Sequence, residues 1–263
     1  MNNNVIAGID AGHIRTKAVL VKGEDILGYA SAATGFDAAA AAEKALSQAL
    51  AAANISRGEV GGLVVTGIFK DIVKVPDLSG EKTIPEYMAD AKGALFLNKN
   101  SRTVIDIGGN VHKAVHYDSN GDLLDVIQND KCADGLGIYY TNLAKTFGMS
   151  EEELSDLALR SKKNAAVAIQ CGLCSESEAI DLMCQGVDIA DAADAAVRFI
   201  VERVASMAST MPLEPEVVVA GGLAKSKALL KHLPVLLKHD VSVLSLPEYA
   251  GAIGAAVSYE GGK

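Results

Sequence analysis

Short apolar or alternating stretches near the start of the chain have the pattern of buried and half-buried β-strands. They predict strands over residues 5–9, 16–22 and 26–32, and a further strand over residues 63–66. An alanine-rich segment over residues 38–53 predicts a helix, and a second helix is expected over residues 84–97. The first third of the chain therefore follows the order strand-strand-strand-helix-strand-helix.

The same order recurs, with extra helices, in the rest of the chain. Strands are expected over residues 103–107, 113–117, 123–128, 217–220 and 241–244. Helices are expected over residues 138–147, 151–159, 175–185, 190–211, 225–237 (with an uncertain end near Pro234) and 249–257. Such a repeat predicts an α/β fold of two lobes, residues 1–100 and 101–263, with a cleft between them. Ligands of such sheets bind outside the carboxyl ends of the strands.

Each predicted lobe opens with an acid and glycines at the end of its first strand. Asp10 and Lys17 are seven residues apart, and Asp106 and Lys113 repeat this spacing. Glycine allows backbone amides to approach a phosphate, aspartate can hold Mg²⁺ through water, and lysine offers a point charge for phosphate. One such element alone is more typical of an ordinary Asp-Gly hairpin turn, but two matched elements predict a phosphate site.

The composition of the chain argues against two classes of protein, those that bind nucleic acids and those that span a membrane. The chain has 263 residues, of which 49% are hydrophobic and 22% charged, and its net charge is -9. An acidic chain without clustered Lys and Arg is a poor candidate for general nucleic-acid binding. The chain has no apolar run of the about 20 residues that a membrane span needs. Its start has neither the basic segment nor the apolar segment of a signal peptide. We therefore expect a cytoplasmic protein without a membrane span.

Four cysteines, all in the second half, point to metal or redox chemistry rather than disulfides in a cytoplasmic protein. Cys132 lies in the stretch 129–137, where glycines at the start of a predicted helix leave N–H groups for an anion. A buried cysteine in a tight turn is the plainer alternative. Cys174 follows Cys171 by one helical turn and either packs or forms a Cys-x-x-Cys pair, and Cys184 is expected in the core.

Two further stretches are rich in small residues. Gly221 and Gly222 form a strand-to-helix turn that leaves room for a base or ribose near the backbone. Residues 247–256 begin a helix whose small side chains favour close packing against another helix.

Together these stretches resemble the ATP-dependent activators of 2-hydroxyacyl-CoA dehydratases and the related ATP-binding subunits of benzoyl-CoA reductase. These proteins belong to the superfamily of acetate kinase, sugar kinases, heat-shock ATPases and actin. The resemblance covers residues 8–17, 106–113, 129–137, 171–180, 221–224 and 249–257. It implies two duplicated ribonuclease H-like lobes, of the actin type, around an ATP cleft.

The resemblance also implies cofactors and their residues. Family members hold one [4Fe-4S] cluster per dimer, with two cysteines from each subunit, which here match Cys132 and Cys171. ATP and Mg²⁺ are implied, with Asp10, Asp106 and Asn110 as catalytic residues. The implied nucleotide-binding residues are Gly12, His13, Thr16, Lys17, Gly108, Gly109, Lys113, Gly135, Gly137, Gly221 and Gly222.

The function implied is ATP-driven transfer of single, low-potential electrons to a CoA-ester dehydratase or reductase. Reduced ferredoxin or flavodoxin is the implied electron donor. The chain is expected to form a homodimer, or a heterodimer with a paralogous subunit.

Several positions depart from the family pattern. The second hairpin usually reads Gly-Gly-Gln-Asp-x-Lys, but here Asn110 and Val111 replace the amide and the acid. His13 stands where Ser or Thr is common, and Ala-Gly-Thr-Gly after the cysteine is replaced by Asp134-Gly135-Leu136-Gly137. Two alternatives therefore stay open: a small-molecule kinase of the same superfamily, and a nucleotide sensor or scaffold with little turnover.

Overall fold

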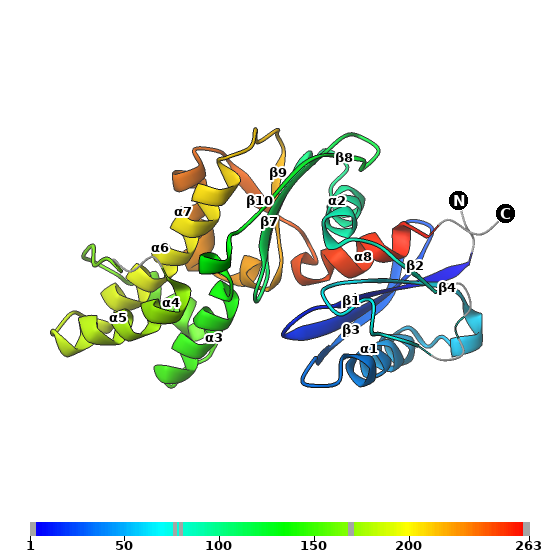
Figure 1. Cartoon of the computed structure of the whole chain (residues 1–263), viewed down its shortest axis with the longest axis horizontal. Helices are drawn as coiled ribbons and strands as arrows, with labels where there is room; N and C mark the ends of the chain where they lie inside the picture. Colours follow the sequence, from blue (N-terminus) through cyan, green and yellow to red (C-terminus); the bar gives the residue numbers. More distant parts are fainter. Residues whose placement is uncertain (1–3, 76–77, 79–80, 168–170, 260–263) are drawn as a thin grey trace.

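Two five-stranded sheets form the centres of two lobes in the computed structural model, which describes residues 4–75, 78, 81–167 and 171–259. The side chains of residues 172–174, and thus that of Cys174, lie outside what is described. The lobes lie side by side, with the helices α2 (Glu86–Leu97) and α8 (Ala250–Val257) between the sheets (Figure 1). The predicted α/β fold with two similar lobes is confirmed.

The first sheet has the strand order β3-β2-β1-β4-β5. β1 pairs with β2 in antiparallel and with β4 in parallel orientation. The elements of this lobe are β1 (Val5–Ala11), β2 (Arg15–Lys22), β3 (Asp25–Ala33), α1 (Ala38–Ala53), β4 (Val60–Thr66) and β5 (Glu81–Thr83). Asp37 caps α1 by accepting a hydrogen bond from the Ala40 amide at 2.9 Å.

The second sheet repeats this order as β8-β7-β6-β9-β10, with the same antiparallel and parallel pairings. Its strands are β6 (Thr103–Ile107), β7 (His112–Tyr117), β8 (Leu123–Gln128), β9 (Val217–Ala220) and β10 (Val241–Val243). The repeat seen in the sequence is therefore a repeat of sheet topology, and it places the ends of β1 and β6 at equivalent positions.

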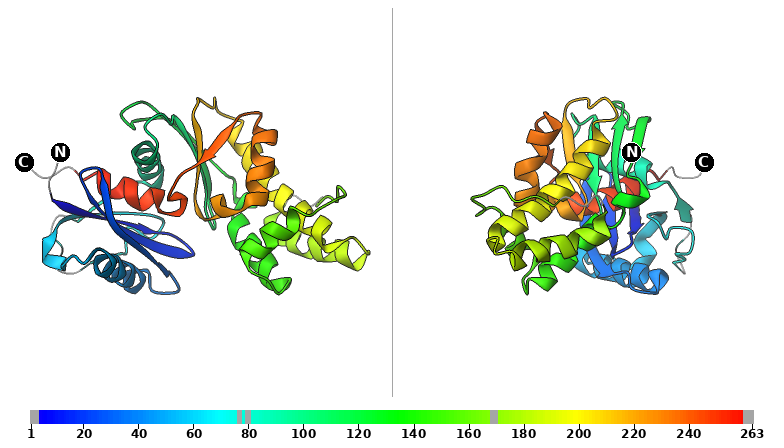
Figure 2. Two further views of the ribbon diagram at one scale, coloured as in Figure 1. Left: turned by 180° about the vertical axis from the view of Figure 1, so that it is seen from behind. Right: turned by 60° about the vertical axis from the view of Figure 1, so that its left-hand side comes forward.

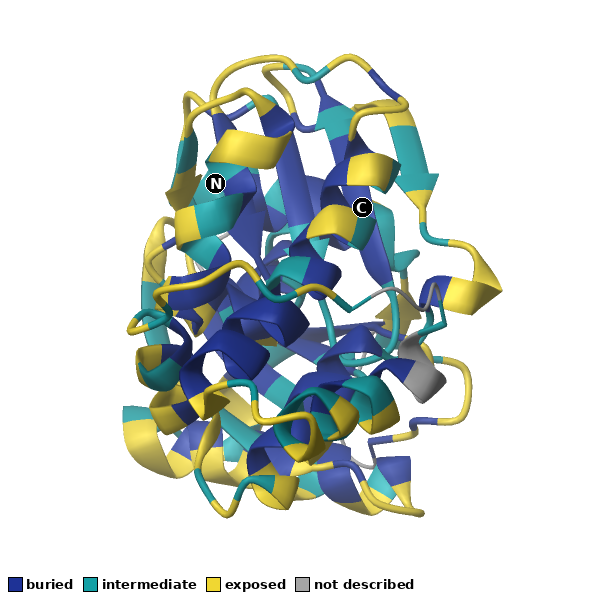
Figure 3. Ribbon diagram, turned by 90° about the vertical axis from the view of Figure 1, so that its left-hand side faces the viewer, coloured by how far each residue is buried: buried dark blue, intermediate teal, exposed yellow. Residues whose placement is uncertain are grey.

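Among the residues that the structure describes, four α-helices lie between the third and fourth strands of the second lobe, where the first lobe has the α-helix α1. They are α3 (Leu136–Thr146), α4 (Glu151–Ala158), α5 (Gly172–Cys184) and α6 (Ile189–Ala208), and α7 (Lys227–Leu237) follows β9. α3 to α6 extend the lobe away from the first sheet, while both chain ends lie at the opposite end (Figure 2). Buried residues concentrate in the sheets and on the helix faces against them (Figure 3).

α2 and α8 approach each other closely because glycines replace side chains at their contact. A Cβ added to Gly254 would lie 1.7 Å from the Ala89 carbonyl oxygen, and one added to Gly93 would lie 1.9 Å from the Ala250 oxygen. The close packing expected of this small-residue segment is thus confirmed. α8 also packs against β1 and β2 of the first sheet. The division of the chain at residue 100 stays a prediction, and α8 is the element whose packing lies across it.

Some details differ from the sequence predictions. α7 continues through Pro234 to Leu237, because the buried side chains of Leu233 and Leu237 hold both parts of the helix against the core. The short strand β5 was not predicted, since three residues carry too little pattern. The prediction of Cys184 in the core is wrong: it is the last residue of α5 and is exposed. Among the described helices, none is long and apolar enough to cross a membrane.

The helix contact gives a stability prediction. The substitution Gly254→Ala would place a methyl group against the Ala89 carbonyl and force α2 and α8 apart, so we expect a loss of about 1–3 kcal/mol in the free energy of unfolding. Urea unfolding measures this loss. Gly58→Ala is the control, because no atom lies within 4 Å of the added Cβ. Equal stability of both variants would contradict the tight contact.

Candidate functional site

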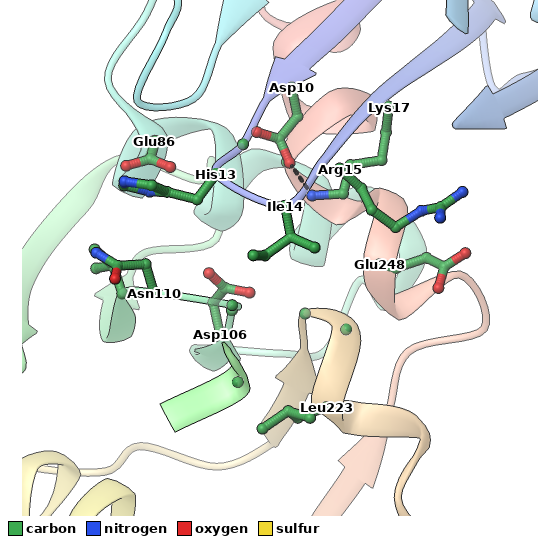
Figure 4. A pocket seen from close by; sticks show the side chains of 18 of the residues that line it. Asp10, His13, Ile14, Arg15, Lys17, Glu86, Asp106, Asn110, Leu223 and Glu248 are labelled. Carbon is green, nitrogen blue, oxygen red and sulfur yellow. Dashed lines mark hydrogen bonds and ion pairs between the residues drawn. The ribbon is translucent and has the colours of Figure 1, made fainter. Parts of the chain in front are cut away.

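A cleft between the lobes brings the two predicted hairpins together (Figure 4). The turns touch, since a Cβ added to Gly109 would lie 2.5 Å from Cγ1 of Ile14. Most of the residues predicted for a nucleotide site line this cleft: Asp10, Gly12, His13, Lys17, Asp106, Gly108, Gly109, Asn110, Lys113, Gly137, Gly221 and Gly222. The structure thus gathers residues from distant parts of the chain at one place, while their individual roles stay predictions.

In the first hairpin, the strand register places Asp10 directly opposite Lys17. Nζ of Lys17 donates to Oδ2 of Asp10 at 2.8 Å, and Figure 4 shows this contact at the edge of the cleft. Burial alone would lower the pKa of Lys17, but the charge and hydrogen bond of Asp10 outweigh it, so the pKa is raised. Lys17 therefore stays cationic, as a phosphate-binding lysine must.

In the second hairpin, Lys113 is held by three carboxylates. It is only 3% exposed, and its Nζ lies 3.1 Å from Asp90, 3.2 Å from Asp106 and 3.9 Å from Glu86. Burial opposes its charge, but these carboxylates outweigh burial and raise its pKa well above the usual range. Asp106 stands opposite Lys113 in the register, as Asp10 does opposite Lys17.

The sequence analysis missed the acids that α2 contributes. Glu86 and Asp90 lie four residues apart on α2, so both reach the cleft from one face of the helix. The sequence signal for these acids was a pair of carboxylates four residues apart, directly after Pro85 at a predicted helix start. Burial raises the pKa of Asp90 to about 8, and it also raises the pKa of Glu86.

Two predicted binding residues support the cleft from outside it. Thr16 is buried, and its hydroxyl lies 3.0 Å from that of Thr34, which in turn donates to the Gly12 carbonyl at 2.7 Å. Gly135 caps α3 with a φ of 81°, and its amide donates to the Asn110 carbonyl at 2.8 Å. Both residues hold the backbone of a hairpin turn rather than facing the cavity.

The third glycine turn closes the cleft on the side of β9. Gly221 has a φ of 89°, and a Cβ there would lie 2.4 Å from the Ile107 carbonyl oxygen. Only glycine therefore fits between β9 and the second hairpin. Gly222 and Leu223 continue along the cleft wall, beside Glu248.

Cys132 and Cys171 precede two helices that pack against each other, α3 and α5. Cys132 is exposed in a short 3₁₀ turn capped by Asp130, whose Oδ1 accepts from the Ala133 amide at 3.0 Å. Cys171 is partly exposed at the N-cap of α5. Within the described part of the chain, no three His, Cys, Asp or Glu side chains gather closely enough to hold a metal ion.

The residues on either side of the Cys132 turn are bonded directly to the second hairpin. The Ile138 amide donates to the Gly109 carbonyl at 3.0 Å, and the Asn129 side-chain oxygen accepts from the His112 amide at 2.7 Å. A Cβ on Gly137 would lie 2.6 Å from the Gly108 carbonyl oxygen. The backbone of α3 therefore rests on the hairpin that lines the cleft, and Cys132 lies in the turn just before this helix.

The chain is similar in sequence and in structure to known proteins over nearly its whole length. The model of the BadF/BadG/BcrA/BcrD ATPase family matches residues 7–258. The activator of lactoyl-CoA dehydratase from Anaerotignum propionicum is 31% identical over 259 residues, covering 96% of each chain.

Two solved structures are similar throughout. The activator of the 2-hydroxyisocaproyl-CoA dehydratase from Clostridium difficile, with bound ADPNP, superposes with a TM-score of 0.88 at 27% identity, covering 96% of this chain and 93% of that one. The (R)-2-hydroxyglutaryl-CoA dehydratase component A of Acidaminococcus fermentans gives a TM-score of 0.86 at 27% identity, covering 97% and 96%.

The buried acid Asp90 predicts a pH dependence of stability. Its folded pKa, about 8, exceeds the value of about 3.9 expected in an unfolded chain. Between these two pH values Asp90 is protonated in the folded protein but ionised in the unfolded chain. The free energy of unfolding therefore falls as the pH rises, by at most about 1.4 kcal/mol per pH unit from this group. Asp90→Asn removes this contribution, and the stability of the variant relative to wild type should increase from about pH 4 to pH 8.

Urea unfolding of the nucleotide-free proteins at several pH values tests this expectation. Asp240→Asn is the control, because Asp240 is exposed. Parallel pH profiles for Asp90→Asn and the wild type would show that Asp90 titrates normally.

Proposed function

Because the chain belongs to the BadF/BadG/BcrA/BcrD ATPase family, we propose that it hydrolyses ATP in the cleft between its lobes and uses the hydrolysis to drive single-electron transfer. The electron carrier would be a [4Fe-4S] cluster shared by two copies of the chain, or by this chain and a paralogue. The observation that carries the proposal is the direct bonding between the cleft hairpin and the residues on either side of the Cys132 turn.

The nucleotide part of the proposal depends on the charges of the cleft. Lys17 and Lys113 are both kept cationic by carboxylates, which suits contact with phosphate oxygens. Asp10 and Asp106 would hold Mg²⁺ through water, and Asn110 lines the same cleft. The bound ADPNP in the Clostridium difficile activator supports a nucleotide in this cleft.

The cysteines suit a cluster shared between two chains. Iron–sulfur clusters are held by thiolates, usually four, so each chain must offer two. Cys132 and Cys171 supply two thiols in turns that are at least partly exposed, ahead of two packed helices. When bound there, a [4Fe-4S] cluster supplies a one-electron carrier. A position on a two-fold axis would make it sensitive to the angle between the subunits.

The names of the relatives support the kind of partner. The Anaerotignum propionicum protein is an activator of lactoyl-CoA dehydratase, and the Clostridium difficile protein activates 2-hydroxyisocaproyl-CoA dehydratase. We propose that this chain delivers electrons to a CoA-ester dehydratase or reductase in the cytoplasm, with reduced ferredoxin or flavodoxin as the donor.

One observation favours a second candidate function. Val111 stands where the family hairpin usually has an acid, which would suit a nucleotide-binding subunit with little ATPase activity. An ATPase assay with and without the partner protein distinguishes the two functions. A small-molecule kinase would not need Cys132 or Cys171, so a brown colour after anaerobic purification separates the proposed electron-transfer protein from a kinase.

The cysteine assignment can be tested directly. Cys132→Ala and Cys171→Ala should each abolish iron binding and the broad visible absorption of the anaerobically purified protein. Cys184→Ala is the matched control, because Cys184 is exposed at the opposite end of α5 from Cys171, and it should keep full iron content. Retention of iron by either of the first two variants would show that the ligands are wrongly assigned.

The proposed coupling predicts that the nucleotide state changes the redox potential. Couplings between linked sites are typically about 1–3 kcal/mol, and a one-electron couple shifts by 59 mV per tenfold change in equilibrium constant, so we expect a difference of roughly 40–130 mV. Redox titration with ADP-Mg²⁺ and with ADPNP-Mg²⁺ measures it. By reciprocity, the oxidised and reduced proteins should differ in nucleotide affinity.

Rates of iron loss to a chelator provide a second readout in the same two nucleotide states. Identical potentials and identical chelation rates would mean that the contacts between α3 and the hairpin transmit nothing. Energy coupling would then have to be abandoned, even if ATP hydrolysis itself were observed.

A further inference from the structure

Six acidic side chains line the cleft. Glu151 accepts a hydrogen bond from the Thr141 hydroxyl at 2.6 Å, and Glu248 is paired with Lys225. The other four acids differ in how firmly they are held. Oδ2 of Asp10 is 2.8 Å from Lys17, and Asp106 and Asp90 lie 3.2 Å and 3.1 Å from Lys113. These three side chains are at most 15% exposed. Glu86 differs, since it is 3.9 Å from Lys113 and its side chain is 30% exposed. Glu86 is thus the least firmly paired and most exposed of these four carboxylates, and the one most accessible to a molecule in the cleft.

The position of Glu86 is well defined by the fold. It is the first residue of α2, directly after Pro85, whose φ of -61° suits the start of a helix. α2 itself is fixed against α8 through Gly93 and Gly254. In Figure 4 the Glu86 carboxylate points into the space that Asp10, Asp106 and Asn110 also face. A carboxylate on a helix that is held in place by close packing is suited to orienting a small molecule there.

We propose that Glu86 is a catalytic residue of the ATP hydrolysis described above, with its carboxylate orienting the attacking water and accepting its proton. This inference rests on the proposed function and adds a residue to it. The water oxygen forms a bond to the γ-phosphorus while the bond from that phosphorus to the β,γ-bridging oxygen breaks. ADP leaves with this electron pair, and the water proton passes to Glu86 and then to solvent.

The surroundings of Glu86 suit this role. Burial raises the pKa of its carboxyl, and this effect outweighs the nearby charge of Lys113. Asp10 and Asp106 raise the pKa further, while Lys17 lowers it. A carboxylate with a raised pKa accepts a proton more readily near neutral pH than an ordinary one. Its neighbours Asp10, Asp90 and Asp106 are each engaged with a lysine at 3.2 Å or less.

The test compares Glu86→Gln with the wild type under saturating ATP-Mg²⁺. The substitution keeps the size of the side chain but removes its ability to accept a proton, so we expect kcat for hydrolysis to fall by about 100-fold or more. The affinity for ADPNP-Mg²⁺, measured by calorimetry, should stay within about threefold. Glu202→Gln is the matched control, because Glu202 is exposed on α6, and it should leave kcat unchanged.

The outcomes separate this inference from the proposed function. A Glu86→Gln variant that hydrolyses ATP within about twofold of the wild-type rate overturns the catalytic role and leaves the proposed function standing. Loss of ADPNP binding in the variant also overturns it, because Glu86 would then serve binding or folding. A wild-type protein that binds nucleotide but hydrolyses none, with its partner present, overturns the proposed function instead.

Discussion

The contact between α2 and α8 determines the geometry of the cleft. The two backbones meet where Gly93 and Gly254 carry no side chain, and the pair fills the space between the sheets. α2 brings Glu86 and Asp90 to Lys113, while α8 brings Gly251 beside Asp10 and Asp90. The positions of Glu86 and Asp90 relative to Lys113 therefore depend on how closely these helices approach, and a larger side chain at the contact would shift both acids relative to the lysine.

The acids that line the cleft outnumber its cations, which are Arg15, Lys17 and Lys113. Lys17 and Lys113 are each neutralised by carboxylates that also face the cavity. In the proposed function, a phosphate chain and its cation would take the place of some of these internal partners. The exchange would occur on the hairpin that supports the start of α3, which gives a physical route from the cleft to the helix that follows the Cys132 turn.

Much of the cleft could be predicted from the sequence, because its geometry is local. A seven-residue spacing across a tight hairpin places Asp10 opposite Lys17 and Asp106 opposite Lys113, as the registers show. The contributions of α2 could not be predicted in this way. They depend on which face of a helix meets the second sheet, and that is decided by tertiary packing. The prediction that Cys184 lies in the core was wrong for a similar reason, because α5 exposes this residue to solvent.

The first sheet is completed by the last helix of the chain. Ile6, Val19 and Val21 on one face of this sheet pack with Ala252, Ile253 and Ala256 of α8. During synthesis, this apolar face leaves the ribosome more than two hundred residues before the helix that covers it. The first lobe therefore cannot reach its final packing until α8 has been synthesised.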